Sequence, residues 1–172
     1  MTTDPDQKWE SRVADAWASI DAYGEERADE FRALIDSLVA ELPPGSGGVG
    51  PFERACAFDS TGHSDRAVPL YREALRLGLT GIRRRRAVIQ LASSLRNVGQ
   101  VEESIALLTA ERARTSDELD DALACVLALC LAELGREREG LALVIEALAP
   151  HLPRYQRSMA NYARALVEPD RA

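Results

Sequence analysis

The sequence predicts an all-α protein built from stacked helical hairpins. A pattern of small residues, large apolar residues and a glycine recurs along the chain, and its glycines, Gly62, Gly99 and Gly135, lie 37 and then 36 residues apart. Apolar residues at helical spacing are frequent, and no stretch alternates polar and apolar residues as a half-buried strand does. A fixed period of this length is typical of a repeat protein, in which each unit packs mainly against its neighbours.

The first 42 residues predict an acidic helical arm. One apolar stripe, at steps of four, four and three residues, predicts a helix over residues 6–22 and consists of Trp9, Val13, Trp17 and Ile20. A second stripe predicts a helix over residues 25–42. Gly24 between them allows either a helical hairpin or one bent helix. We favour the hairpin, because acidic residues follow the glycine as they do in the first turn of a helix.

A proline- and glycine-rich segment, residues 43–50, is the predicted linker. It contains the letters of the dinucleotide-binding glycine pattern, but that pattern requires a strand before it, whereas a helix and two prolines precede it here. The remaining residues, 51–172, predict three hairpins and a capping helix. The paired helices are 51–60 with 64–77, 81–97 with 101–112, and 117–133 with 136–149, and the last helix is 153–167.

Small residues mark where helices are expected to cross closely. On the first helix of each hairpin these are Ala55, Ala92 and Ala128, and on the second helix Ala67, Ser104 and Gly140 are expected to permit another close crossing. The glycine in each reversal reaches backbone conformations that other residues avoid. Large residues on the second helices are expected to fill the layer beneath, and these are Tyr71, Leu108 and Val144.

This order of small and large residues resembles the tetratricopeptide repeat (TPR). Two segments, Phe58-Asp59-Ser60-Thr61-Gly62 and Pro153-Arg154-Tyr155-Gln156-Arg157-Ser158, also make the chain similar to a family of small bacterial TPR proteins whose biochemical role is not established. The resemblance implies a right-handed array of helical hairpins, an α-α superhelix, and a homodimer that mediates protein contacts without enzymatic activity. The closing proline of the repeat is absent after the first unit, where Leu77-Gly78-Leu79-Thr80-Gly81 stands instead.

In arrays of this kind the first helices of successive units line the concave face. Counting from the small residue of each unit places Asp59, Arg86, Ile89, Ser93 and Arg96 among the inward-facing residues, with Asn97 at the edge, and these are the expected groove residues. Arginine pairs with carboxylates in a defined geometry, so we expect a protein or peptide partner, with an acidic one favoured. The alternative is that Asp59 and the arginines pair with one another across neighbouring units, because buried charges need partners.

The arm carries the negative charge of the chain. Residues 1–50 hold 11 acidic and 4 basic residues, a net of −7, and residues 51–172 hold 17 of each. The tryptophan stripe of the arm cannot be buried by one helix, so it must cap the first repeat, be exchanged in a dimer or bind a foreign partner. A regulatory alternative is that the acidic arm covers the arginine-bearing groove and blocks it.

Several other classes of function are disfavoured. The net charge argues against nucleic acid, and the run Arg83–Arg86 fans out around its helix instead of forming one patch. The three cysteines lack metal-binding or redox spacing, and no cofactor motif is present, so we expect neither metal nor cofactor. The longest apolar run, residues 123–134, is too short to cross a membrane, and the N-terminus is acidic and polar, so we expect a cytoplasmic protein. A remote alternative is an uncharacterised enzyme that uses Asp59, His63 and the arginines.

Overall fold

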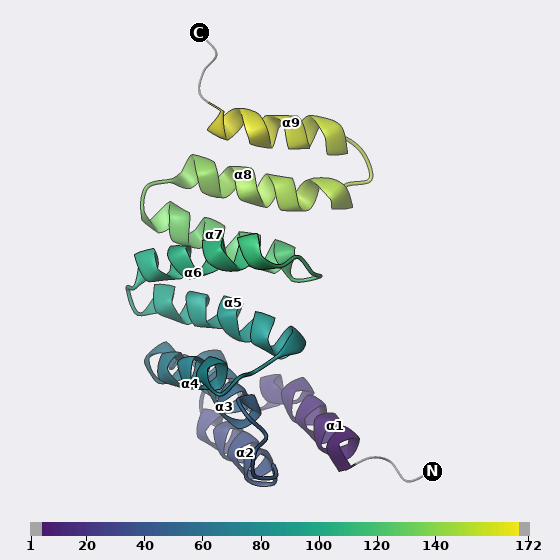
Figure 1. Cartoon of the computed structure of the whole chain (residues 1–172), viewed down its shortest axis with the longest axis vertical. Helices are drawn as coiled ribbons and strands as arrows, with labels where there is room; N and C mark the ends of the chain where they lie inside the picture. The colour runs from purple at the N-terminus through teal and green to yellow at the C-terminus, as the bar shows by residue number, and fades with distance from the viewer. Residues whose placement is uncertain (1–4, 169–172) are drawn as a thin grey trace. The chain divides into compact units, whose positions relative to one another are not determined.

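A computed structural model describes residues 5–168, which form nine α-helices and two short 3-10 helices and contain no β-strand (Figure 1). In chain order these are α1 (Pro5–Ala18), η1 (Ile20–Ala22), α2 (Ala28–Ala40), α3 (Val49–Ser60), α4 (Ser64–Arg76), α5 (Gly81–Asn97), α6 (Val101–Arg114), α7 (Asp120–Glu133), α8 (Glu137–Leu148), η2 (Ala149–His151) and α9 (Gln156–Val167). The predicted all-α fold of helical hairpins is confirmed. The predicted arm and capping region also include residues 1–4 and 169–172, which lie outside the described part of the chain.

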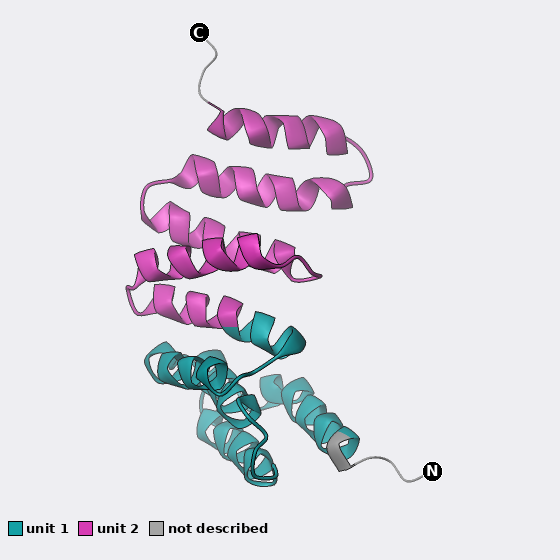
Figure 2. Cartoon of the chain, viewed as in Figure 1, with its two compact units in different colours: residues 1–87 teal, residues 88–172 magenta. Residues whose placement is uncertain are grey.

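Two compact units make up the chain, residues 1–87 and residues 88–172 (Figure 2). Unit 1 contains α1 to α4 and the start of α5, and unit 2 contains the rest of α5 and α6 to α9. The predicted division into an arm (1–42), a linker (43–50) and a repeat region (51–172) follows the hairpins and not these units, and it stays a prediction.

The three glycine reversals are equivalent in structure, as the repeat predicts. Gly62, Gly99 and Gly135 have φ angles of 81°, 79° and 72°. The amide of the residue after each glycine donates to the carbonyl five positions earlier: His63 to Phe58 at 2.9 Å, Gln100 to Leu95 at 2.8 Å and Arg136 to Leu131 at 2.9 Å. This bond defines the Schellman motif, which satisfies carbonyls that the end of a helix leaves unpaired. Gly78 ends α4 in the same way, where the closing proline of the repeat is absent.

Three helices begin three residues later than the sequence pattern predicts: α2 begins at Ala28 instead of residue 25, and α7 and α9 are also late. Local turn chemistry explains the starts of α7 and α9. α7 begins at Asp120 instead of residue 117, because the Asp117 carboxylate accepts a hydrogen bond from the Leu119 amide at 2.9 Å and holds a turn there. α9 begins at Gln156 instead of residue 153, because Tyr155 adopts a left-handed conformation with φ of 69°.

The core of unit 1 joins the arm to the first repeat. Its buried apolar residues come from α1, α2 and α3 and include Trp9, Val13, Phe31, Ile35, Leu38 and Ala57. Phe31 and Ile35 are 0% and 1% exposed, and full burial of such a side chain stabilises the folded state by about 1.5–3 kcal/mol. The arm is therefore part of this core and not a separate helical pair.

The C-terminal end of the expected linker, residues 43–50, packs against α4. A Cβ at Gly48 would lie 2.1 Å from the carbonyl oxygen of Ala74, so only glycine fits between the two backbones. Val49 and Gly50 already belong to α3. This end of the segment is consequently held against α4.

Unit 2 shows the predicted close crossings between paired helices. The Ser104 hydroxyl donates to the carbonyl oxygen of Ala92 at 2.7 Å, and a Cβ at Gly140 would lie only 2.8 Å from the carbonyl oxygen of Ala128. One expectation about the layer beneath is wrong: Tyr71 and Leu108 are fully buried, whereas Val144 is 36% exposed. Among the described residues, α9 packs on α8 with a single buried side chain, Ala163, so Val144 stays partly open to solvent.

Candidate functional site

Asp59, the first of the predicted groove residues, lies at the end of α3 beside α4. Its carboxylate accepts hydrogen bonds from the Tyr71 hydroxyl at 3.3 Å and from the Ser64 hydroxyl at 3.4 Å. Tyr71 is fully buried, and its hydroxyl also lies 3.6 Å from the Cys56 sulfur. Burial raises the pKa of the Cys56 thiol to about 12, so this cysteine stays protonated at neutral pH. Asp59 thus belongs to a polar cluster within the first hairpin.

Arg86, on the first half of α5, presents an exposed guanidinium. The guanidinium carbon lies over the Phe52 ring, 5.3 Å from its centroid, which is within the range of a cation–π interaction. Phe52 itself is fully buried in α3. A rigid aromatic ring therefore supports a charge that remains open to solvent.

The other predicted groove residues belong to unit 2 and differ in exposure. Ile89 is only 7% exposed and packs in the core with Ala92, Leu123 and Leu127, so it offers little surface to a partner. Ser93 is half-buried, and Asn97 is exposed in the last turn of α5. Ile89 therefore contributes mainly to the hydrophobic core of unit 2 and not to the predicted groove.

Arg96 is engaged within unit 2. Its guanidinium forms an ion pair with Glu133 of α7, and its Nε is buried without a hydrogen-bond partner. Burial raises the pKa of the Cys130 thiol, and the hydrogen bond with Ser104 and the positive charge of Arg96 oppose that shift only in part. The expected pairing of the groove arginines with Asp59 is replaced for Arg96 by a pairing with Glu133.

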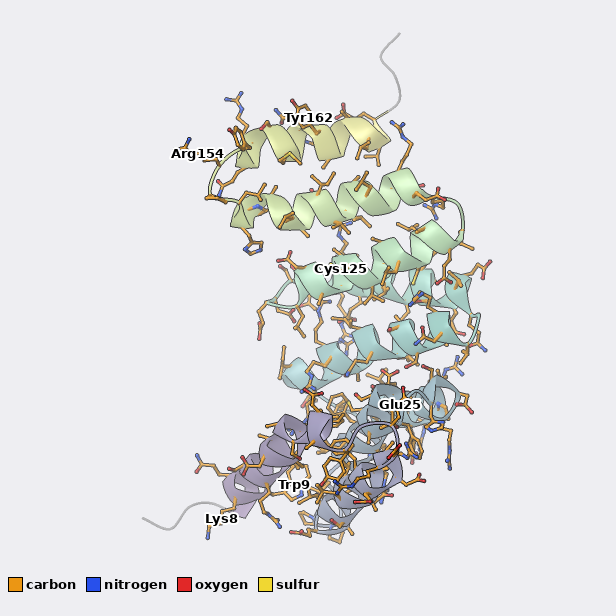
Figure 3. All side chains as sticks on the ribbon, turned by 180° about the vertical axis from the view of Figure 1, so that it is seen from behind. Lys8, Trp9, Glu25, Cys125, Arg154 and Tyr162 are labelled. Carbon is orange, nitrogen blue, oxygen red and sulfur yellow. The ribbon has the colours of Figure 1, made fainter. Side chains whose placement is uncertain are left out.

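The tryptophan stripe of the arm lies inside unit 1. Trp9 points from α1 toward α2 (Figure 3), and its indole Nε1 donates to the Leu38 carbonyl at 2.8 Å. Val13 is 4% exposed, and Trp17 and Ile20 are half-buried against the same core. Trp17 meets the Phe31 ring edge-on, with ring centroids 5.1 Å apart. Contacts within one chain therefore cover most of this stripe.

A buried carboxylate connects the arm to α3 and α5 in unit 1. Glu53 is only 3% exposed, and it accepts a hydrogen bond from the Trp17 indole at 2.9 Å. Arg83 of α5 lies 3.3 Å from the other oxygen of Glu53 and forms a second ion pair with Glu10 of α1, at 2.8 Å and 2.5 Å. Sequence reasoning missed this network, although a glutamate on the apolar face of a predicted helix signals a buried charge that needs a partner.

The arginine run is not a surface patch. Arg83 is committed to Glu10 and Glu53, and Arg85 is 2% exposed. The two carboxylates that Arg83 binds come from α1 and α3 of unit 1. Arg86 remains the exposed member nearest the predicted groove.

The sequence model of the family described as "Tetratrico peptide repeat" matches residues 48–166. The chain belongs to this family. The match runs from the start of α3 into α9 and leaves α1 and α2 outside it. No curated protein and no solved structure matches the chain with significant similarity.

Membership of the tetratrico peptide repeat family indicates a module for contacts between proteins. Within residues 5–168 no three histidine, cysteine or acidic side chains gather closely enough to hold a metal ion. His63 precedes α4 and meets the Phe58 ring edge-on at 6.3 Å, and Asp59 is bonded to Tyr71 and Ser64. In the same described part, no helix has the length and apolar character that crossing a membrane requires.

Proposed function

We propose that this tetratrico peptide repeat protein is a non-enzymatic, cytoplasmic interaction module that binds a peptide or helix of a partner protein. In unit 1 its main charge anchor is Arg86 of α5, with Asp59 of α3 as a further polar contact. In unit 2 its proposed contacts are Ser93, Arg96 and Asn97 of α5. Family membership supports the class of function, and the exposed guanidinium of Arg86 over Phe52 is the observation that carries the site.

Arg86 suits this role because its position is prepared before binding. The stacked ring restricts the guanidinium, so less side-chain entropy is lost when a carboxylate of the partner pairs with it. Arg96 is a weaker anchor, because a partner would have to compete with Glu133 for its guanidinium. An acidic segment is therefore expected to make its strongest charged contact at Arg86.

The test compares two charge reversals. Arg86→Glu changes the proposed anchor, and Arg66→Glu is its matched control, because Arg66 also stacks on a phenylalanine, Phe58, at 4.5 Å but belongs to α4. Wild type and both variants are immobilised, and the proteins that they retain from an extract of the native host are quantified by mass spectrometry. We expect Arg86→Glu to retain a set of partner proteins in at least tenfold lower amount than wild type does. Arg66→Glu should retain the same set at the wild-type amount. Equal retention by all three proteins would refute the site.

The ion pair between the arm and α5 supports a second candidate, an autoinhibited module. Glu10 of α1 holds Arg83, one helical turn before Arg86. In this alternative the arm weakens binding until a partner with competing acidic residues displaces it. Glu10→Gln should then raise the affinity for the captured partners by a few fold, and Asp15→Asn, also on α1 and exposed, serves as its control. Unchanged affinity in Glu10→Gln would exclude this regulation.

We further propose that the protein forms a homodimer. The arm either caps its own chain or is exchanged with a second copy, in which case the hydrogen bond between Trp17 and Glu53 would join two chains. The contacts of the arm within one chain favour the cap. Light scattering should give twice the chain mass of 18.8 kDa. A mass that stays at one chain across the accessible concentration range would refute the dimer.

A further inference from the structure

A pocket in unit 2 lies outside the proposed groove. Its volume is about 370 Å³, and residues of α6, α7, α8 and α9 line it. No residue of α5 contributes to it, so the pocket is independent of the partner site proposed above. Pockets that bind small molecules usually measure roughly 300–1,000 Å³, so this pocket has room for a small organic ligand.

The inner surface of the pocket is apolar. Leu127 and Leu131 of α7 and Ala142 of α8 are between 4% and 7% exposed, and Leu143 and Val167 extend the same surface. Such a surface gains free energy when a hydrocarbon displaces water, at about 25 cal/mol for each Å² that is buried. The pocket therefore favours the apolar part of a ligand.

The rim of the pocket carries one more positive than negative charge. Arg136 pairs with Glu139 at 2.8 Å, and Arg112 lies 3.5 Å from Glu146. The third arginine, Arg164 of α9, donates to the Asn161 side chain and to the Ala160 carbonyl at 3.4 Å. Among the described residues it has no carboxylate within ion-pair distance.

We propose that this pocket binds a small monocarboxylate with an apolar body, such as a medium-chain aliphatic acid. The hydrocarbon lies on Leu127, Leu131 and Ala142, and the carboxylate pairs with Arg164. Charge complementarity selects the acid, because the other two arginines of the rim already face glutamates. The small volume of the pocket, about 370 Å³, suits one short chain better than an extended peptide, which needs several anchors along a groove.

The experiment uses the full-length protein with methyl groups labelled for NMR. Octanoate is the probe, and 1-octanol is the matched ligand that keeps the hydrocarbon but lacks the charge. Two variants test the two parts of the site: Arg164→Gln removes the anchor, and Thr109→Trp fills the rim from an exposed position on α6. Arg157→Gln, also exposed on α9 but outside the lining, is the control, and thermal unfolding checks that each variant folds.

We expect octanoate to shift the methyl resonances of Leu127, Leu131 and Leu143 and to bind at least tenfold more tightly than 1-octanol. Arg164→Gln should abolish this difference while leaving 1-octanol within twofold of its wild-type affinity. Thr109→Trp should abolish the binding of both ligands, and Arg157→Gln should leave both affinities unchanged.

Three results would overturn the proposal. Methyl resonance shifts confined to residues outside the pocket lining would place the ligand elsewhere. Equal affinity of wild type and Arg164→Gln for octanoate would show that Arg164 does not bind the carboxylate. If the methyl resonances of the pocket do not shift with octanoate but shift with the peptide Ac-Glu-Leu-Leu-Glu-amide, the pocket is a docking site for protein segments instead.

Discussion

Replacement of Glu53 by alanine tests how the arm is held in unit 1. Glu53 is almost fully buried, and it binds both the Trp17 indole and Arg83. In Glu53→Ala the indole N–H loses its acceptor, and Arg83 loses one of its two carboxylates. The arm should therefore detach from α3 more readily than in wild type.

The size of this effect follows from what remains after the change. Removing one partner of a buried ion pair costs about 3–5 kcal/mol when the other charge is left uncompensated. Arg83 keeps Glu10 and has 24% of its side chain exposed, so part of that penalty is avoided. We expect a loss of about 2–3 kcal/mol, the unpaired indole included. A domain of this size has a free energy of unfolding of about 4–13 kcal/mol, so the loss is a large fraction.

The chain supplies its own reporter for this experiment. Its only two tryptophans, Trp9 and Trp17, lie in the arm, so fluorescence during urea unfolding reports on the arm, whereas circular dichroism reports on all helices. With a slope of roughly 1–3 kcal/mol per molar urea, the midpoint by fluorescence should fall by about 0.7–3 M. Glu41→Ala is the control, because it removes an exposed ion pair with Arg12, and exposed ion pairs contribute little to stability. Equal midpoint shifts in Glu53→Ala and Glu41→Ala would refute the reasoning.

Three further predictions concern helix crossings and buried groups. Gly140→Ala should destabilise unit 2 by about 1–2 kcal/mol in urea unfolding. The clash of the new Cβ with the Ala128 backbone outweighs a gain of about 1 kcal/mol in helix propensity. A stabilised variant would contradict this prediction. Arg96→Glu should cost about 1–3 kcal/mol by the same measurement, because it places a second carboxylate beside Glu133, and unchanged stability would show that this ion pair is unimportant. Burial raises the pKa of Cys56 from 9.0 to about 12, so the folded state holds this proton more tightly than the unfolded chain does. The free energy of unfolding, followed by circular dichroism, should therefore fall as the pH rises from about 9 to about 12. Cys56→Ser should reduce this pH dependence, and an identical profile in the variant would show that Cys56 does not cause it.

The reversals between paired helices could be predicted because their signals are local. A glycine at the end of a helix takes a positive φ and permits a Schellman motif whatever the rest of the chain does, and Gly62, Gly99 and Gly135 all do so. The starts of α7 and α9 could not be predicted from apolar spacing. They depend on a side-chain turn at Asp117 and on a left-handed Tyr155, which periodicity does not encode.

Partner choice among charged residues was much less predictable than the helices. Arginine pairs with any carboxylate within reach, and residues far apart in the sequence decide which one that is. Arg96 pairs with Glu133, 37 residues later, and Arg83 pairs with Glu10, 73 residues earlier. The expected groove also included Ile89, whose spacing matched but whose side chain is buried by Leu123 and Leu127.

The amino-acid pattern alone was enough to establish the helices, their pairing and the tetratricopeptide character, because backbone geometry and apolar spacing act over a few residues. Packing in three dimensions settled the rest: that the arm packs into the core of unit 1, that Glu53 binds Trp17 and Arg83, and that Arg164, among the described residues, has no carboxylate partner beside an apolar pocket. These features depend on burial, and burial depends on segments that approach one another only after the chain has folded.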